Sequence, residues 1–148
     1  MTMKKMSELN DLMFMLDDID YKKYPILLVD DDPTVLETML SLFADSFSIE
    51  GAGSADEALE LIKTRDYAVC ISDQRMPNVN GAEFLSLAKM ISPTMIRVLI
   101  TGYTDLEAAI DAINECEIFR FIKKSAPTDE KEERIKEAIH QYIIQSEL

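Results

Sequence analysis

The sequence predicts an α/β fold of three layers, a doubly wound five-stranded parallel sheet with helices on both faces. One observation is a series of short, continuous apolar runs rich in β-branched residues, the pattern of parallel strands covered on both sides. These runs are Ile26–Val29, a weaker Phe47–Ile49, Ala68–Ile71, Ile96–Ile100 and Ile118–Ile122. The other observation is that a segment of helical periodicity follows each run, and this alternation implies right-handed crossovers between parallel strands.

Each helical segment carries a stripe of apolar residues at three- and four-residue spacing, which we expect to face the core. The stripes are Val35, Leu36, Met39, Leu40 and Phe43; Ala55, Ala58, Leu59 and Ile62; Phe84, Leu85, Leu87, Ala88 and Ile91; Leu106, Ala109, Ile110 and Ile113; and Ile135, Ala138, Ile139, Tyr142 and Ile143. Capping signals mark where four of the helices begin. They are Asp32 with Pro33, Ser54 with Glu57, Asn80 with Glu83 and Thr104 with Glu107.

Composition excludes several classes of protein. The 148 residues suffice for one domain with one core, and 28 acidic against 15 basic residues give a net charge of −13. Such a surface repels a phosphate backbone, so we expect no direct binding to nucleic acid. No apolar run approaches the ~20 residues of a membrane span, and the N-terminus lacks the features of a signal peptide. Cys70 and Cys116 form no disulfide framework, which suits the cytoplasm.

Residues 1–23 precede the alternating strands and helices and form an N-terminal extension to a main domain over residues 24–148. Apolar residues at helical spacing in the extension predict a short amphipathic helix. These residues are Leu9, Leu12, Met13, Leu16 and Ile19. The helix is either packed on the domain or frayed in solvent, or it serves in dimerisation or partner docking.

The candidate site comprises the polar residues that follow the apolar runs, because ligands of an open parallel sheet bind at the carboxyl ends of its strands. These residues are Asp30, Asp31, Asp32, Ser72, Asp73, Thr101, Lys123 and Lys124. Crowded carboxylates repel one another, and Mg²⁺ offsets that repulsion. An ionised aspartate can then attack a phosphoryl group whose charge lysine and threonine stabilise. One such aspartate alone is usually a helix cap, as expected for Asp32, but the full set indicates phosphoryl transfer.

Three motifs carry a resemblance to a known family. They are Ile26–Pro33 (ILLVDDDP), Ser72–Pro77 (SDQRMP) followed by Asn80 and Gly81, and Leu99–Tyr103 (LITGY). Together they resemble the receiver domain of two-component response regulators, the CheY-like family, over roughly residues 24–146. The resemblance implies a flavodoxin-like strand order of 2-1-3-4-5. It also implies a phosphorelay signalling protein that catalyses its own phosphorylation and slow dephosphorylation and is not a turnover enzyme.

The resemblance assigns a role to each acidic position. Asp73 would be the phosphoacceptor, and a phosphohistidine on a sensor histidine kinase or phosphotransfer protein would be the donor. Asp31 and Asp73 would bind Mg²⁺ directly, Asp30 would act through water, and the backbone carbonyl of Arg75 would complete the protein ligands.

The resemblance also implies a switch, with one departure from the family pattern. Thr101 would hydrogen-bond the phosphoryl group, and Phe121 would rotate with it, altering the surface of the fourth helix, fifth strand and fifth helix. That surface and the N-terminal extension are candidate homodimer interfaces. Alignment makes Lys124 the strand-five lysine, with Lys123 the alternative, but Ser125 follows where receivers carry proline. A non-proline cis bond costs ~3–4 kcal/mol, so the bond is either trans or held at a cost.

Two other functions compete. A degenerate receiver would only bind proteins, and the missing proline motivates that reading. The other is an aspartate-nucleophile phosphohydrolase, which generally needs an acid two residues after its nucleophile. This chain has Arg75 at that position, which argues against a phosphohydrolase. Few residues follow the last predicted helix, so we expect either a stand-alone receiver or a fragment of a longer regulator.

Overall fold

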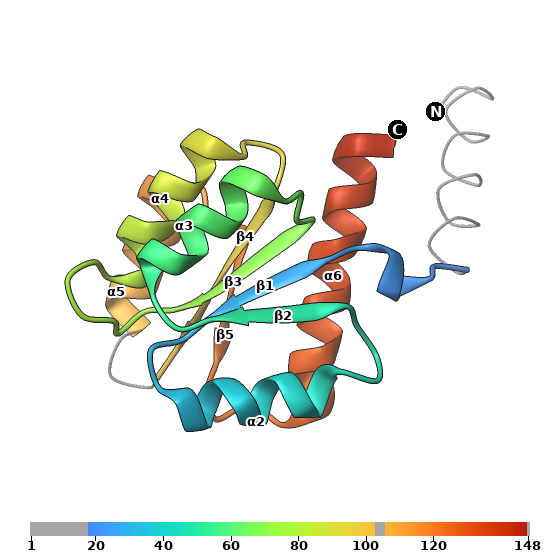
Figure 1. Cartoon of the computed structure of the whole chain (residues 1–148), viewed down its shortest axis with the longest axis horizontal. Helices are drawn as coiled ribbons and strands as arrows, with labels where there is room; N and C mark the ends of the chain where they lie inside the picture. The colour runs from blue at the N-terminus through green and yellow to red at the C-terminus, as the bar shows by residue number, and fades with distance from the viewer. Residues whose placement is uncertain (1–17, 103–105, 148) are drawn as a thin grey trace.

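A computed structural model of the chain describes residues 18–102 and 106–147, and its centre is one parallel sheet (Figure 1). The strands are β1 (Ile26–Val29), β2 (Ile49–Ala52), β3 (Val69–Asp73), β4 (Ile96–Thr101) and β5 (Arg120–Lys123). They lie in the order β2-β1-β3-β4-β5, and every pairing is parallel. The sheet confirms the predicted fold class and strand order.

Helices cover both faces of the sheet. They are α2 (Pro33–Phe43), α3 (Ala55–Thr64), α4 (Gly81–Ile91), α5 (Leu106–Cys116) and α6 (Thr128–Glu147), and a 3-10 helix, η1 (Tyr21–Lys23), precedes β1. Figure 1 shows α2 and α6 on one side and α3, α4 and α5 on the other. Alternate residues of β1 serve the two sides, since Leu28 joins the core under α2 and α6 whereas Leu27 joins the core under α3 and α4. Two apolar cores therefore hold the strand ends in fixed register.

The strand boundaries differ from the apolar runs at both ends. Phe47 is buried but precedes β2, which begins at Ile49, and β5 begins at Arg120 rather than at Ile118. At the carboxyl ends, β3 continues through Asp73 and β4 through Thr101. The reason is that parallel pairing continues past the apolar residues, with Asp73 opposite Ile100. Two candidate site residues are thus held by the ladder itself.

Three of the four predicted helix starts are confirmed. Asp32 accepts hydrogen bonds from the backbone N–H groups of Thr34 and Val35 at 3.0 and 3.3 Å. Ser54 accepts from Glu57 N at 3.1 Å, while the Glu57 carboxylate accepts from Gly53 N, one residue before the expected partner. Asn80 likewise accepts from the N–H of Glu83 at 2.9 Å. The fourth start, at Thr104, lies outside the described residues.

The predicted stripe of α4 is only partly correct. Phe84, Leu85 and Ala88 are buried, but Leu87 is 44% exposed and Ile91 is 38% exposed. Ile110 of α5, also expected in the core, is 46% exposed. Periodicity gives the angular position of a residue on its helix, but it does not say how far the neighbouring helix extends to cover it.

The last residues before β1 pack on the domain. Ile19 and Tyr21 contact the core under α2 and α6. The Tyr21 hydroxyl and Nε2 of His140 in α6 share a hydrogen bond of 2.7 Å, and the Lys136 ammonium lies 5.2 Å from the centre of the tyrosine ring. The predicted amphipathic helix falls largely outside the described residues. Within the described part of the chain, no helix combines the length and apolarity that a membrane span requires.

Candidate functional site

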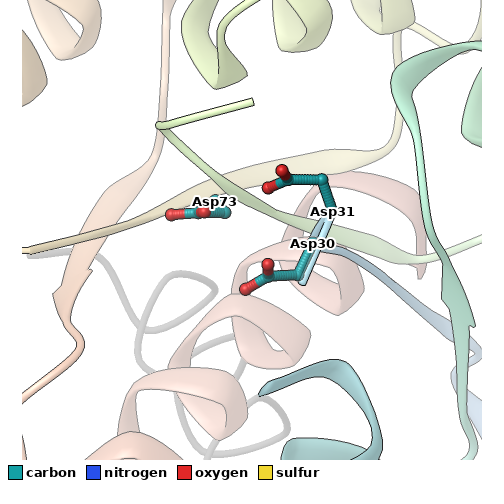
Figure 2. Close-up of side chains that lie close together, drawn as sticks. All are labelled: Asp30, Asp31 and Asp73. Carbon is teal, nitrogen blue, oxygen red and sulfur yellow. The ribbon is translucent and has the colours of Figure 1, made fainter. Parts of the chain in front are cut away.

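Three carboxylates meet at the carboxyl edge of the sheet. Asp30 and Asp31 directly follow β1, and Asp73 is the last residue of β3. Because β1 and β3 are neighbours, with Val29 opposite Ser72, the three side chains leave the sheet at one level. Carboxylate oxygens of all three lie within 4.8 Å of one another. Figure 2 shows the side chains converging on a common space.

The carboxylates differ in their surroundings. Asp30 is 1% exposed and Asp73 is 3% exposed, whereas Asp31 is exposed to solvent. Oδ1 of Asp30 accepts a hydrogen bond of 2.9 Å from the N–H of Asp32, but its Oδ2 is buried and finds no partner among the described residues. Burial raises the pKa of Asp30, the charges of Asp73 and Asp31 raise it further, and the Asp32 N–H and Lys124 oppose that rise.

Lys124 supplies positive charge to this cluster. Its ammonium lies 3.0 Å from Oδ1 of Asp73, and its backbone N–H donates to the carbonyl of Thr101 at 2.8 Å. Lys124, which the alignment favoured over Lys123, is therefore the lysine in contact with Asp73. No peptide bond of the described residues is cis, so the bond between Lys124 and Ser125 is trans. The lysine reaches Asp73 without the cis geometry that the missing proline would have favoured.

Thr101 ends β4, the strand next to β3. The residue is 1% exposed, and its hydroxyl has no hydrogen-bond partner within the described ranges. A buried hydroxyl without a partner is costly and uncommon. Because Thr101 lies one strand away from Asp73, its position suits a hydroxyl that would hydrogen-bond a ligand at this edge.

The connection from β3 to α4 fixes the position of Asp73, and the sequence patterns assigned no role to Gln74 or Asn78, which belong to it. A Cβ at Gly81 would lie 2.2 Å from the backbone carbonyl oxygen of Asp73, so only glycine allows α4 to start this close to β3. Gln74, 8% exposed, accepts a hydrogen bond of 3.0 Å from the N–H of Ala82. Asn78 adopts a φ of 71°, in the left-handed region that asparagine tolerates. The sequence signal available for Gln74 was a polar residue directly after Asp73, at the end of an apolar run.

The remaining predicted residues lie around this cluster. Arg75 follows Gln74 and is exposed, and Phe121 of β5 is half-buried. The Phe121 ring packs at the margin of the core under α3 and α4, and a hollow of about 220 Å³ adjoins it between β5 and α6. Tyr103, the last residue of the third motif, lies outside the described residues.

The donor set fits a hard divalent cation. Oxygen is the ligand atom that Mg²⁺ prefers, and the site offers three carboxylates, one of which has an unpartnered buried oxygen. The cluster contains no sulfur or imidazole ligand, which are the ligands that Zn²⁺ usually takes. The residues present therefore fit Mg²⁺.

The chain belongs to the response regulator receiver domain family, whose sequence model matches residues 26–139. The hydrogenase transcriptional regulatory protein HoxA of Cupriavidus necator is 31% identical over 127 residues, which cover 86% of this chain and 26% of HoxA. This chain spans about a quarter of the length of the curated relatives it matches first.

Solved structures agree with this family. A structure described as an adenylate cyclase from Rhodopirellula baltica has a TM-score of 0.79 and 35% identity, covering 83% of this chain and 92% of that one. A response regulator receiver domain protein from Clostridium thermocellum has a TM-score of 0.76 and 29% identity, covering 82% and 98%. Receiver domains are the signalling modules of two-component systems and are not turnover enzymes, and the acidic site of this chain fits a phosphoacceptor role.

Proposed function

We propose that this chain is switched by Mg²⁺-dependent phosphorylation of Asp73. The observation that carries the proposal is the cluster itself. A buried aspartate in contact with a lysine shares one edge with two further carboxylates and a buried hydroxyl that has no hydrogen-bond partner in the described part of the chain. Each group suits one demand of phosphoryl transfer, namely a nucleophile, a cation site and donors for the oxygens of the transferred group.

In the proposed reaction, a carboxylate oxygen of Asp73 attacks the phosphorus of a phosphohistidine on a sensor kinase or phosphotransfer protein. The O–P bond forms as the N–P bond breaks, and the electron pair of that bond returns to the imidazole of the donor. Lys124 and Thr101 then face the phosphoryl oxygens with a charge and a hydroxyl. Burial of Asp73 limits access of water to the acyl phosphate, which slows its hydrolysis.

Asp31 and Asp73 would hold Mg²⁺ directly, with Asp30 acting through water and the backbone carbonyl of Arg75 completing the protein ligands. The cation would neutralise the mutual repulsion of carboxylates and phosphoryl oxygens. The raised pKa of Asp30 supports this assignment, because burial next to two other acids disfavours its charged form until a cation is present.

The output surface is proposed to be α5, β5 and α6. Movement of Thr101 toward the phosphoryl group would leave space for Phe121, and the hollow beside that ring supports a change of rotamer. This surface, or the N-terminal extension, would contact an output domain, a partner or a second copy. Since HoxA is named a transcriptional regulatory protein, a longer regulator built on this receiver could act on DNA through another domain. The net charge of −13 argues against DNA contact by the receiver itself. We place the protein in the cytoplasm, where sensor kinases present their phosphohistidine.

Acetyl phosphate with Mg²⁺ tests the proposal. The wild-type chain should gain one phosphoryl group by intact mass spectrometry, and Asp73→Asn should gain none. Asp45→Asn, at an exposed acid far from the cluster in sequence, is the matched control and should label like wild type. Label that persists in Asp73→Asn would refute the acceptor assignment. A folded chain that neither labels nor changes its NMR spectrum with beryllofluoride and Mg²⁺ would instead be a binding module only.

A further inference from the structure

Exposed apolar side chains concentrate on one part of the molecule. Among the described residues, six large apolar side chains are exposed, and four of them belong to α4 and α5. Leu87, Met90 and Ile91 lie on α4 and Ile110 on α5, with Met90 82% exposed. The two helices are in contact and lie side by side on the same face of the sheet (Figure 1). Clustered apolar exposure of this kind marks an interaction site more often than single exposed residues do.

A groove of about 570 Å³ runs along this pair of helices, and we name it the α4–α5 groove. Its apolar lining comes from Val79, Ala82, Leu87, Met90 and Cys116. It shares α5 with the proposed output surface but extends the other way, onto α4, and neither β5 nor α6 contributes to its lining.

The charges around the groove have one sign. Glu83, Asp111 and Glu115 line it, and no lysine or arginine does. None of these three acids forms a salt bridge within the described part of the chain. Lys89, the basic residue of α4, is engaged with Glu117. The α4–α5 groove, apolar with these acids at its edges, is therefore complementary to an apolar surface flanked by bases.

We propose that the α4–α5 groove binds an amphipathic helix of a partner protein, with lysine or arginine beside its apolar stripe. Apolar side chains one turn apart would contact Leu87 and Met90, as in helix-in-groove recognition. The flanking bases would pair with Glu83, Asp111 and Glu115. A second copy of this chain fits poorly, because a symmetric contact sets the same acids against one another. Nucleic acid and anionic membrane are repelled by the same charges.

A pair of peptides tests this proposal. Each is an amphipathic helix of about 18 residues, roughly 27 Å long, with leucines on one face and either lysines or glutamates beside them. Binding is measured by calorimetry and by NMR on the full chain without Mg²⁺ or phosphodonor, so the outcome does not depend on phosphorylation of Asp73. We expect the lysine peptide to shift resonances of Ser86, Met90 and Glu115 and the glutamate peptide to bind at least tenfold more weakly.

Variants locate the binding. Met90→Ala should weaken the lysine peptide roughly tenfold, as loss of a central apolar contact does. The double variant Asp111→Lys with Glu115→Lys should reverse the preference between the two peptides. Leu42→Ala and Glu37→Lys on α2 are matched controls, since both positions are exposed and lie away from the groove. They should leave affinity for the lysine peptide within about twofold of wild type.

Several results would overturn the proposal. One is the absence of any shift of groove resonances with the lysine peptide, and another is equal binding of both peptides. A third is a loss of affinity for the lysine peptide in the α2 controls as large as in Met90→Ala. Sedimentation tests whether a second copy of this chain is the occupant. A dimer that Met90→Ala converts to a monomer would mean that this chain fills its own groove. Binding of vesicles rich in anionic lipid, lost in Met90→Ala, would assign the groove to a membrane instead.

Discussion

The Lys124 ammonium and the Asp73 carboxylate lie 3.0 Å apart, although Asp73 ends β3, Lys124 follows β5, and β4 lies between these two strands. The contact partly neutralises Asp73, so the lysine and a bound cation compete for the same negative charge. We predict that Lys124→Met binds Mg²⁺ about fivefold more tightly than wild type, or about 1 kcal/mol. Lys124→Arg keeps the charge and should bind Mg²⁺ like wild type in a calorimetric titration. An unchanged affinity in Lys124→Met would mean that the lysine lies apart from the acids in solution.

Mg²⁺ should also stabilise the fold, because it binds a cluster that only the folded chain assembles. At a tenfold excess over its dissociation constant, the gain in unfolding free energy is about 1.4 kcal/mol, measurable as a rise in Tm. Asp31→Asn should reduce this gain without destabilising the metal-free protein, because Asp31 is exposed and its charge only adds repulsion there. Equal Mg²⁺ stabilisation of wild type and Asp31→Asn would contradict the ligand assignment.

Thr101 provides a test in which removal of a polar group stabilises the protein. Thr101→Val keeps the shape of the side chain and deletes the buried hydroxyl, which has no partner among the residues that the structure describes. We expect the free energy of unfolding to rise by about 1 kcal/mol, as measured by urea denaturation without Mg²⁺. The same variant should lose the NMR shifts at Phe121 that beryllofluoride induces in wild type, because the hydroxyl no longer reaches the ligand. Destabilisation of similar size would show instead that the hydroxyl is hydrogen-bonded before activation.

Gly81 tests the close packing of α4 on β3. Gly81→Ala places a Cβ 2.2 Å from the Asp73 carbonyl oxygen, so backbone must move, and we expect a loss of about 2–3 kcal/mol in unfolding free energy. Labelling at Asp73 should fall with it, because the shift displaces the acceptor. Gly53→Ala is the control, since its added Cβ would meet nothing closer than 3.7 Å. Equal stability of the two variants would argue against the close approach.

We predict that the stability of the fold depends on pH through His140, which joins Tyr21 to α6. Burial lowers the pKa of His140, Lys136 acts in the same direction, and Glu133 and Glu137 oppose it. The unfolded chain therefore binds the proton more readily, and stability is lost as pH falls from the ordinary pKa of about 6.5 toward the lower folded value. Protonation also disturbs the hydrogen bond with Tyr21. The difference in Tm between wild type and His140→Gln should shrink from pH 8 to pH 5.5, and a constant difference would falsify this linkage.

The site was accessible to sequence reasoning because it depends on topology more than on packing. Continuous apolar runs indicate parallel strands, and parallel strands bring their carboxyl ends to one edge. The strand order that the family resemblance implied then puts β1 beside β3, so Asp30, Asp31 and Asp73 were expected to approach one another. The same reasoning left Lys123 and Lys124 open. A strand end is defined only to within a residue or two by its pattern, whereas the contact with Asp73 depends on where β5 stops.

Other features depend on contacts that no local pattern contains. Tyr21 and His140 are 119 positions apart, and nothing near either residue indicates their hydrogen bond. Gly81 belonged to a motif of the family resemblance, but the reason that only glycine fits there is the carbonyl of Asp73 lying against it. Leu87, Ile91 and Ile110 had the spacing of core residues, yet in the packed fold no neighbouring element covers them fully and they remain exposed.

The sequence by itself determined the fold class and, through its family resemblance, the strand order. It also determined the cluster of acids at the sheet edge, which indicates phosphoryl transfer. Periodicity and strand-end residues are local properties, and backbone sterics translate them into a parallel sheet with right-handed crossovers. Only the tertiary structure decided which lysine contacts Asp73, which hydroxyl is left without a partner, and that an apolar groove with acidic edges opens between two helices. Those outcomes depend on distances between elements, which arise from the packing of the whole chain.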